Sequence, residues 1–143
     1  MVEQDELKQL IQNMLVEPPG TMSKELVRKC AGLIKLEPER KEVRLLSESV
    51  FTEKERIVLF CLGRRLLSYL ANDPSIADVS RGELEKQFGF DLPKVSAYAS
   101  MLISAKFLER GSPGSYRARL SGMAEFLDKV RKKADSNKKE EQE

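Results

Sequence analysis

Apolar residues recur at helical spacing in several segments of the chain. The first stripe repeats every three or four positions and consists of Leu7, Leu10, Ile11, Met14 and Leu15. This spacing predicts an amphipathic helix over about residues 3–16, ended by Pro18, Pro19 and Gly20. A second helix from about Ser23 is expected to bury Leu26, Val27, Cys30 and Ala31. We expect the two to form a helical hairpin that needs further packing for stability.

The longest apolar run predicts the central helix of the fold. Between Leu36 and Val50 the chain is polar apart from Val43, Leu45 and Leu46, so a short strand and an extended connector both remain open. Thr52 and Glu55 then have the spacing of a capping box. The following helix contains IVLFCL (57–62) and is apolar on nearly every side, as a helix inside a core should be.

The next segment predicts two helices joined by a tight turn. Ser80 and Glu83 repeat the capping spacing at the start of a short helix. A turn at residues 89–91 follows, after which Asp91 can cap a second helix with Pro93 in its first turn. A short helix, a turn of about three residues and a second helix make the sequence form of a helix-turn-helix unit.

Two extended runs and a last helix complete the pattern. KFLER and SYRARL flank the turn GSPGS (111–115), which predicts a β-hairpin. The last helix starts at Ser121, and its apolar stripe consists of Met123, Phe126, Leu127 and Val130. The tail 135–143 is charged, and its composition predicts disorder.

Length and composition indicate one main domain with appendages. The chain has 143 residues, of which 41% are hydrophobic and 34% charged. We therefore divide it into an N-terminal helical extension (1–46), a main domain (47–134) and the disordered tail (135–143). No apolar run is long enough for a membrane span, and the acidic N-terminus is unlike a signal peptide, so we expect a cytoplasmic protein.

Charge is distributed unevenly along the chain. The net charge is +2, but residues 51–134 contain 15 Lys and Arg against 10 Asp and Glu, a local excess of +5. Such an excess makes a polyanion a plausible partner, although a solvated basic face would look the same.

The chain offers little catalytic chemistry. It has no histidine, which removes the commonest general base and zinc ligand. Cys30 and Cys61 lie among apolar neighbours, where a reduced, buried thiol is the ordinary state. There is no GxxxxGK phosphate loop, and the carboxylates show no metal-site spacing. We expect no enzyme activity, no metal and no cofactor.

Residues 79–120, VSRGELEKQFGFDLPKVSAYASMLISAKFLERGSPGSYRARL, together with the central helix before them, resemble the winged helix-turn-helix superfamily. The chain also looks like uncharacterised archaeal transcription-regulator-like proteins of similar length. The resemblance implies a mainly α fold with a small β-hairpin: a winged helix-turn-helix domain preceded by the N-terminal helical hairpin and followed by a C-terminal helix. It also implies that the second helix of the pair enters the DNA major groove while the hairpin, or wing, touches the backbone. Winged helices also serve as protein-docking modules, so the choice between DNA binding and protein docking depends on the individual residues.

The second helix of the pair has an unusual outer face. Val95, Ala99, Leu102 and Ile103 are predicted to face the core. The opposite side and its edges present Pro93, Lys94, Ser96, Ala97, Tyr98, Ser100, Met101 and Ser104. SAYASM (96–101) lacks the arginine or side-chain amide that reads base edges, so any readout would be weak. Close approach of another helix, with Tyr98 and Met101 as anchors, explains this face equally well.

Cations elsewhere favour DNA. Arg110, Arg117 and Arg119 lie on the hairpin, and Arg81 and Lys94 lie at helix starts, where phosphate binds well. Tyr116 either donates a hydrogen bond to phosphate or packs on the hairpin. The alternative is that these arginines pair with Glu83, Glu85 and Glu109. Arg64 and Arg65 are expected on a solvated face of the central helix.

The leading hypothesis is a transcription regulator that contacts duplex DNA mainly through phosphates. The predicted contacts are Arg81, Lys94, Ser96, Ala97, Tyr98, Ser100, Met101, Arg110, Tyr116, Arg117 and Arg119. A homodimer is plausible, because the N-terminal hairpin and the last helix present apolar stripes that one small domain does not bury entirely. The alternative is a protein–protein interaction module that does not bind DNA.

Overall fold

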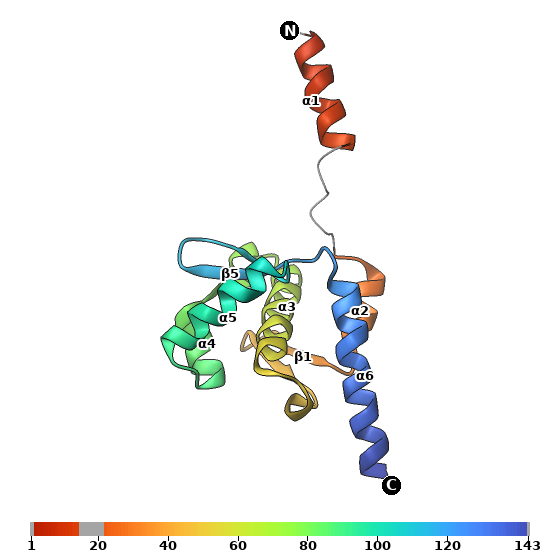
Figure 1. The fold of residues 1–143 in the computed structure, drawn as a ribbon, viewed down its shortest axis with the longest axis vertical. Helices are drawn as coiled ribbons and strands as arrows, with labels where there is room; N and C mark the ends of the chain where they lie inside the picture. Colours follow the sequence, from red (N-terminus) through yellow and green to blue (C-terminus); the bar gives the residue numbers. More distant parts are fainter. Residues whose placement is uncertain (1, 15–21, 143) are drawn as a thin grey trace.

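The computed structural model describes residues 2–14 and 22–142. The described part of the chain is mainly helical, with two small antiparallel sheets (Figure 1). Its elements are α1 (Val2–Met14), α2 (Lys24–Cys30), β1 (Ile34–Glu37), β2 (Glu42–Leu45), η1 (Glu48–Val50), α3 (Glu53–Ala71), η2 (Pro74–Ala77), β3 (Val79–Ser80), α4 (Arg81–Phe88), α5 (Leu92–Ser104), β4 (Leu108–Arg110), β5 (Ser115–Ala118) and α6 (Met123–Gln142).

Helix α3 lies at the centre of the fold, as its apolar run predicts. Its residues 57–63 are all buried, and the other elements of the body pack around it. The predicted capping box is present: the Thr52 hydroxyl accepts from the Glu55 amide at 3.2 Å, and the Glu55 carboxylate accepts from the Thr52 amide at 2.8 Å. The helix ends at Asn72, whose left-handed backbone (φ 52°) closes its last turn.

The predicted helix–turn–helix segment is also present. Ser80 caps α4, Gly89 ends it in the left-handed region at φ 72°, and Asp91 caps α5 by accepting from the Lys94 amide at 2.9 Å. Val95, Ala99 and Leu102 of α5 are buried as expected, and Ile103 is half-buried.

The β4–β5 hairpin forms around residues 111–114, and its register pairs Leu108 with Ala118 and Arg110 with Tyr116. A third strand, which was not predicted, completes this sheet: β3 pairs antiparallel with β5, so β5 lies in the middle of the sheet. With α3, α4 and α5, this sheet makes an arrangement compatible with a winged-helix-like fold.

Helix α6 packs along the body with Met123, Phe126, Leu127 and Val130 buried, as its stripe predicts. The composition of residues 135–143 predicted disorder, but α6 continues to Gln142, and residue 143 lies outside the described residues. In the sequence Asp135 precedes Lys138 and Lys139 by three and four positions, a spacing that supports a helix that already has a folded start.

Residues 34–45 form a second hairpin, β1–β2, which packs on α3. Val43 was left open between strand and connector and lies in β2, whereas β1 was not predicted. Gly63 of α3 allows the close approach: a Cβ there would overlap the Val43 side chain and lie 3.3 Å from Cγ2 of Ile34. Leu26 and Cys30 of the predicted extension belong to the same core as the main domain.

The predicted N-terminal helical hairpin is wrong. Helix α2 packs against α6, while α1 stands clear of the body (Figure 1), and residues 3–11 of α1 are all exposed. Of the α2 residues expected inside, Leu26 and Cys30 are buried, but Val27 and Ala31 are exposed. Helix α2 is held by only two buried side chains, Leu26 and Cys30, because it packs on the long helix α6.

Candidate functional site

Two of the predicted cations meet at the turn of the β4–β5 hairpin. Arg81, the first residue of α4, and Arg110, the last of β4, line a hollow of about 160 Å³ together with residues 111–116. We call this the Arg81–Arg110 hollow. No acidic side chain lines it, and both arginines are exposed. The positive end of the α4 dipole lies beside it, so the hollow combines the groups that hold phosphate.

Serines fix the shape of the turn beside these arginines. The Ser115 hydroxyl and amide both donate to the Ser112 carbonyl, at 2.8 and 2.9 Å, and the two hydroxyls lie 2.8 Å apart. Gly114 takes φ 79°, a conformation that disfavours side chains. The turn is therefore pre-shaped before any ligand arrives.

Other predicted contacts on the hairpin are engaged within the protein. Arg117 donates from Nε and Nη2 to Oδ1 of Asp78, at 3.1 and 2.8 Å, so its partner is none of the three glutamates considered above. Tyr116 is buried, which supports packing over a phosphate contact. Arg119 is half-buried, and its amide donates to the Phe107 carbonyl.

Lys94 is likewise held at the start of α5. Its Nζ lies 2.7 Å from Glu53 Oε2 and 4.9 Å from the centre of the Phe90 ring. Tyr98 donates to the same carboxylate at 3.1 Å. The hydrogen bond between Lys94 and Glu53 raises the pKa of the lysine and lowers that of the carboxyl group. The pair is nearly half exposed, so phosphate can compete for Lys94 only by displacing Glu53.

The outer face of α5 is exposed as predicted. Pro93, Ala97, Ser100, Met101 and Ser104 face solvent, and Ser96 is half-buried. Apart from Lys94, the helix has no charged side chain. The structure thus brings Arg81 and Arg110 together but adds no base-reading group on α5.

The expectation that Arg64 and Arg65 lie on a solvated face is wrong. Arg64 donates to the Ile76 carbonyl at 2.9 Å and pairs with Glu83 of α4. Arg65 pairs with Glu109 of β4 at 3.4 Å and donates to the Ala118 carbonyl of β5. Both side chains are more than four-fifths buried. They tie α3 to the helix–turn–helix segment and to the β4–β5 hairpin, which orients the Arg81–Arg110 hollow.

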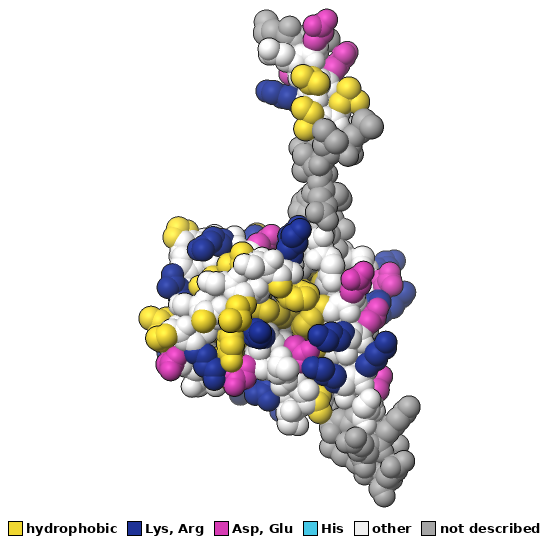
Figure 2. Space-filling model, in the orientation of Figure 1, with side chains coloured by type: hydrophobic (Ala, Val, Ile, Leu, Met, Phe, Trp, Pro, Cys, Tyr) yellow, Lys and Arg dark blue, Asp and Glu magenta, His cyan; other side chains and the backbone are white. Residues whose placement is uncertain are grey.

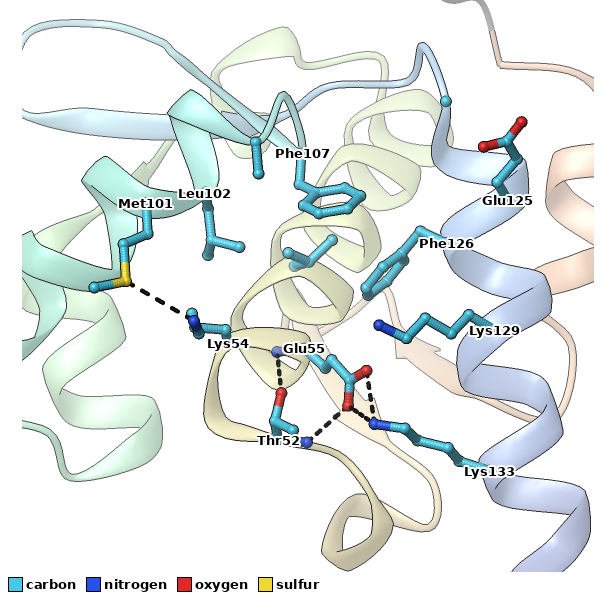
Figure 3. Close-up of a pocket in the computed structure, with 13 residues that line it drawn as sticks. Thr52, Lys54, Glu55, Met101, Leu102, Phe107, Glu125, Phe126, Lys129 and Lys133 are labelled. Atoms are coloured by element: carbon cyan, nitrogen blue, oxygen red, sulfur yellow. Dashed lines mark hydrogen bonds and ion pairs between the residues drawn. The ribbon is translucent and has the colours of Figure 1, made fainter.

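A second candidate surface was not predicted. A groove of about 630 Å³ runs between the start of α3, the end of α5 and α6, and we call it the α5–α6 groove. Leu102, Phe107 and Phe126 line it with apolar surface, and Lys54, Lys129 and Lys133 stand around it (Figure 3). Figure 2 shows the same hydrophobic hollow bordered by basic side chains. The apolar stripes of α5 and α6 predict that these side chains face inward, but they do not predict that a groove remains open between the two helices.

The groove has one buried charge at its edge. Lys133 donates to both oxygens of Glu55, at 2.7 and 2.9 Å. Burial alone would raise the pKa of Glu55, but the hydrogen bonds from Lys133 and from the Thr52 amide more than offset this effect and lower it. The carboxylate therefore stays ionised and joins α6 to the capped start of α3.

The cysteines are free and buried, as expected. Burial raises the pKa of the thiol to about 11 for Cys30 and to about 12 for Cys61, so neither is a ready nucleophile. Within the described residues, no three His, Cys, Asp or Glu side chains are grouped so that they could hold a metal ion. No helix in that part of the chain is long and apolar enough to cross a membrane.

No protein-family model, curated protein or solved structure matches this chain.

Proposed function

We propose that this protein is a winged helix-turn-helix protein that binds duplex DNA through phosphates and acts as a transcription regulator. In this proposal α4 and α5 are the helix pair and β4–β5 is the wing. The observation that carries it is the Arg81–Arg110 hollow, where two exposed arginines, a pre-shaped serine and glycine turn and a helix start converge with no carboxylate among them.

The hollow suits a phosphate group because guanidinium groups bind phosphate oxygens with two parallel hydrogen bonds. The arginines come from two elements that the β3–β5 pairing and the Arg65 contacts hold together. Little backbone ordering is then needed on binding, which favours affinity.

The same geometry predicts little sequence discrimination. Outward positions of α5 are alanine, serine and methionine, which form no bidentate contacts with base edges. Lys94 and Arg117 already have carboxylate partners. Binding should therefore be dominated by phosphate contacts, weaken steeply with salt and differ little among duplexes.

A double variant, Arg81→Gln with Arg110→Gln, tests the proposal by fluorescence anisotropy with a random-sequence duplex. We expect it to bind at least roughly ten-fold more weakly than the wild type at 50 mM salt, since two phosphate contacts are lost. Arg28→Gln is the matched control, because Arg28 is exposed on α2, on the other side of the body (Figure 1). Equal affinity of the double variant and the wild type, or no binding by the wild type at 50 mM salt, would refute the proposal.

The α5–α6 groove favours a second candidate function, the docking of a helix. Its apolar lining and exposed Met101 suit the apolar face of an amphipathic helix. The Arg81–Arg110 hollow and the α5–α6 groove share no lining residue, but Met101 belongs both to the groove and to the outer face of α5.

A further inference from the structure

Helix α1 has an apolar stripe that nothing in the described chain covers. Leu7, Leu10 and Ile11 are 57%, 55% and 43% exposed. Helices of this length are marginal in water unless an apolar face is packed against a partner. The stripe therefore indicates that α1 docks on a surface outside its present surroundings.

The α5–α6 groove has the complementary shape and chemistry. Val58, Leu102, Phe107 and Phe126 are inside the core or half-buried, yet each lines this opening of about 630 Å³. Figure 3 shows Phe107 and Phe126 directed into the space between α5 and α6. The apolar surface that a helix could contact at this opening comes mainly from exposed Met101 and half-buried Phe107, in the manner of helix-in-groove recognition.

The charge of α1 is also complementary to that of the α5–α6 groove. Helix α1 contains Glu3, Asp5 and Glu6 against one cation, Lys8, for a net charge of −2. Three lysines line the groove, Lys54, Lys129 and Lys133, against two carboxylates, Glu55 and Glu125, and no carboxylate pairs with Lys54 or Lys129 among the described residues. This excess of one positive charge favours an acidic amphipathic helix over a basic one.

The geometry points to a second copy as the source of the helix: we propose that α1 of one chain lies in the α5–α6 groove of another, with the exchange made reciprocally. Helix α2, from which α1 leads away, is fixed on α6 by the ion pair between Lys29 and Asp128 and by Arg131, which donates to the Lys29 carbonyl. The groove uses another face of α6, with Phe126 and Lys129. Reciprocal exchange closes a two-fold dimer and covers both apolar surfaces.

Sedimentation equilibrium of the full chain at 150 mM salt tests the proposal. We expect a concentration-dependent dimer whose dissociation constant rises at least roughly ten-fold in Leu10→Asp and in Met101→Asp. Both side chains are more than half exposed, so the fold should survive, and circular dichroism checks this. Asp5→Asn, on the opposite side of α1, is the matched control and should change the constant less than about two-fold.

Mixing the Leu10→Asp and Met101→Asp chains distinguishes docking of α1 in the groove of another chain from dimerisation through other contacts. The Leu10→Asp chain keeps an intact groove, and the Met101→Asp chain keeps an intact α1, so one of the two sites re-forms and a mixed dimer appears. A wild-type monomer at all concentrations would overturn the proposal, as would a dimer unaffected by either variant or an absence of recovery on mixing. Because the DNA proposal rests on other residues, Arg81→Gln with Arg110→Gln should dimerise like the wild type.

Discussion

Neutralising Asp78 should strengthen DNA binding, because this carboxylate holds Arg117 away from solvent on the hairpin proposed to contact DNA. Asp78 accepts both hydrogen bonds from Arg117 and lies beside Gly111, where a Cβ would collide with its carboxylate. Asp78→Asn keeps the size and one acceptor but removes the charge. Arg117 then becomes available to phosphate.

The magnitude follows from one additional phosphate contact. The slope of log affinity against log salt should steepen by about 0.9, so the change from 50 to 200 mM salt costs the variant roughly 3.5-fold more affinity than the wild type. The side chains of Arg117 and Asp78 are 31% and 16% exposed, so losing the ion pair should lower the free energy of unfolding by about 1 kcal/mol.

Fluorescence anisotropy over a salt series measures the slope, and thermal unfolding measures the stability cost. Asp128→Asn is a matched control: it releases Lys29 from an ion pair of the same 2.8 Å length on the α2 side of the molecule, so it changes the net charge equally. We expect tighter low-salt binding and a steeper slope in Asp78→Asn alone. A slope that does not change, or that changes equally in both variants, would refute the placement of the hairpin on DNA.

Two further predictions concern stability. Gly63→Ala should destabilise the fold by about 1–2 kcal/mol, because overlap with Val43 outweighs the helix propensity gained, whereas Gly82→Ala, with its nearest neighbour at 3.9 Å, should be neutral or slightly stabilising in urea unfolding. Glu55→Gln should cost about 2 kcal/mol at pH 7 by leaving Lys133 unpaired. Because the folded-state pKa of Glu55 lies below its ordinary 4.5, the stabilisation is complete above that pH and lost as pH falls through the folded-state pKa. The melting temperatures of the wild type and Glu55→Gln should therefore converge in acid; a constant gap would contradict the ion-pair account.

Features encoded by neighbouring residues were predictable. The caps of α3, α4 and α5 each depend on residues three apart, and the structure contains the predicted hydrogen bond at Thr52, Ser80 and Asp91. The buried face of α6 follows from its 3.6-residue period in the same way. The β4–β5 hairpin was predictable for a similar reason, because the glycines between its two strands mark the turn.

Features that depend on distant pairing were not predictable. The partner of Arg117 lies 39 residues away and is set by β3, whose two residues leave no periodic pattern. Arg64 and Arg65 were misjudged because α3 is surrounded, so that even its polar side faces η2, α4 and the hairpin. The stripe of α1 predicts that it has a partner but does not identify that partner.

The salt dependence of binding to a random-sequence duplex tests the central claim most directly. For the wild type and for Arg81→Gln with Arg110→Gln, the account predicts slopes of log affinity against log salt that differ by about 1.8, one increment of about 0.9 for each arginine. Their affinities should then converge by roughly twelve-fold between 50 and 200 mM salt. Parallel slopes for the two proteins would contradict the assignment of the Arg81–Arg110 hollow as a phosphate-binding site.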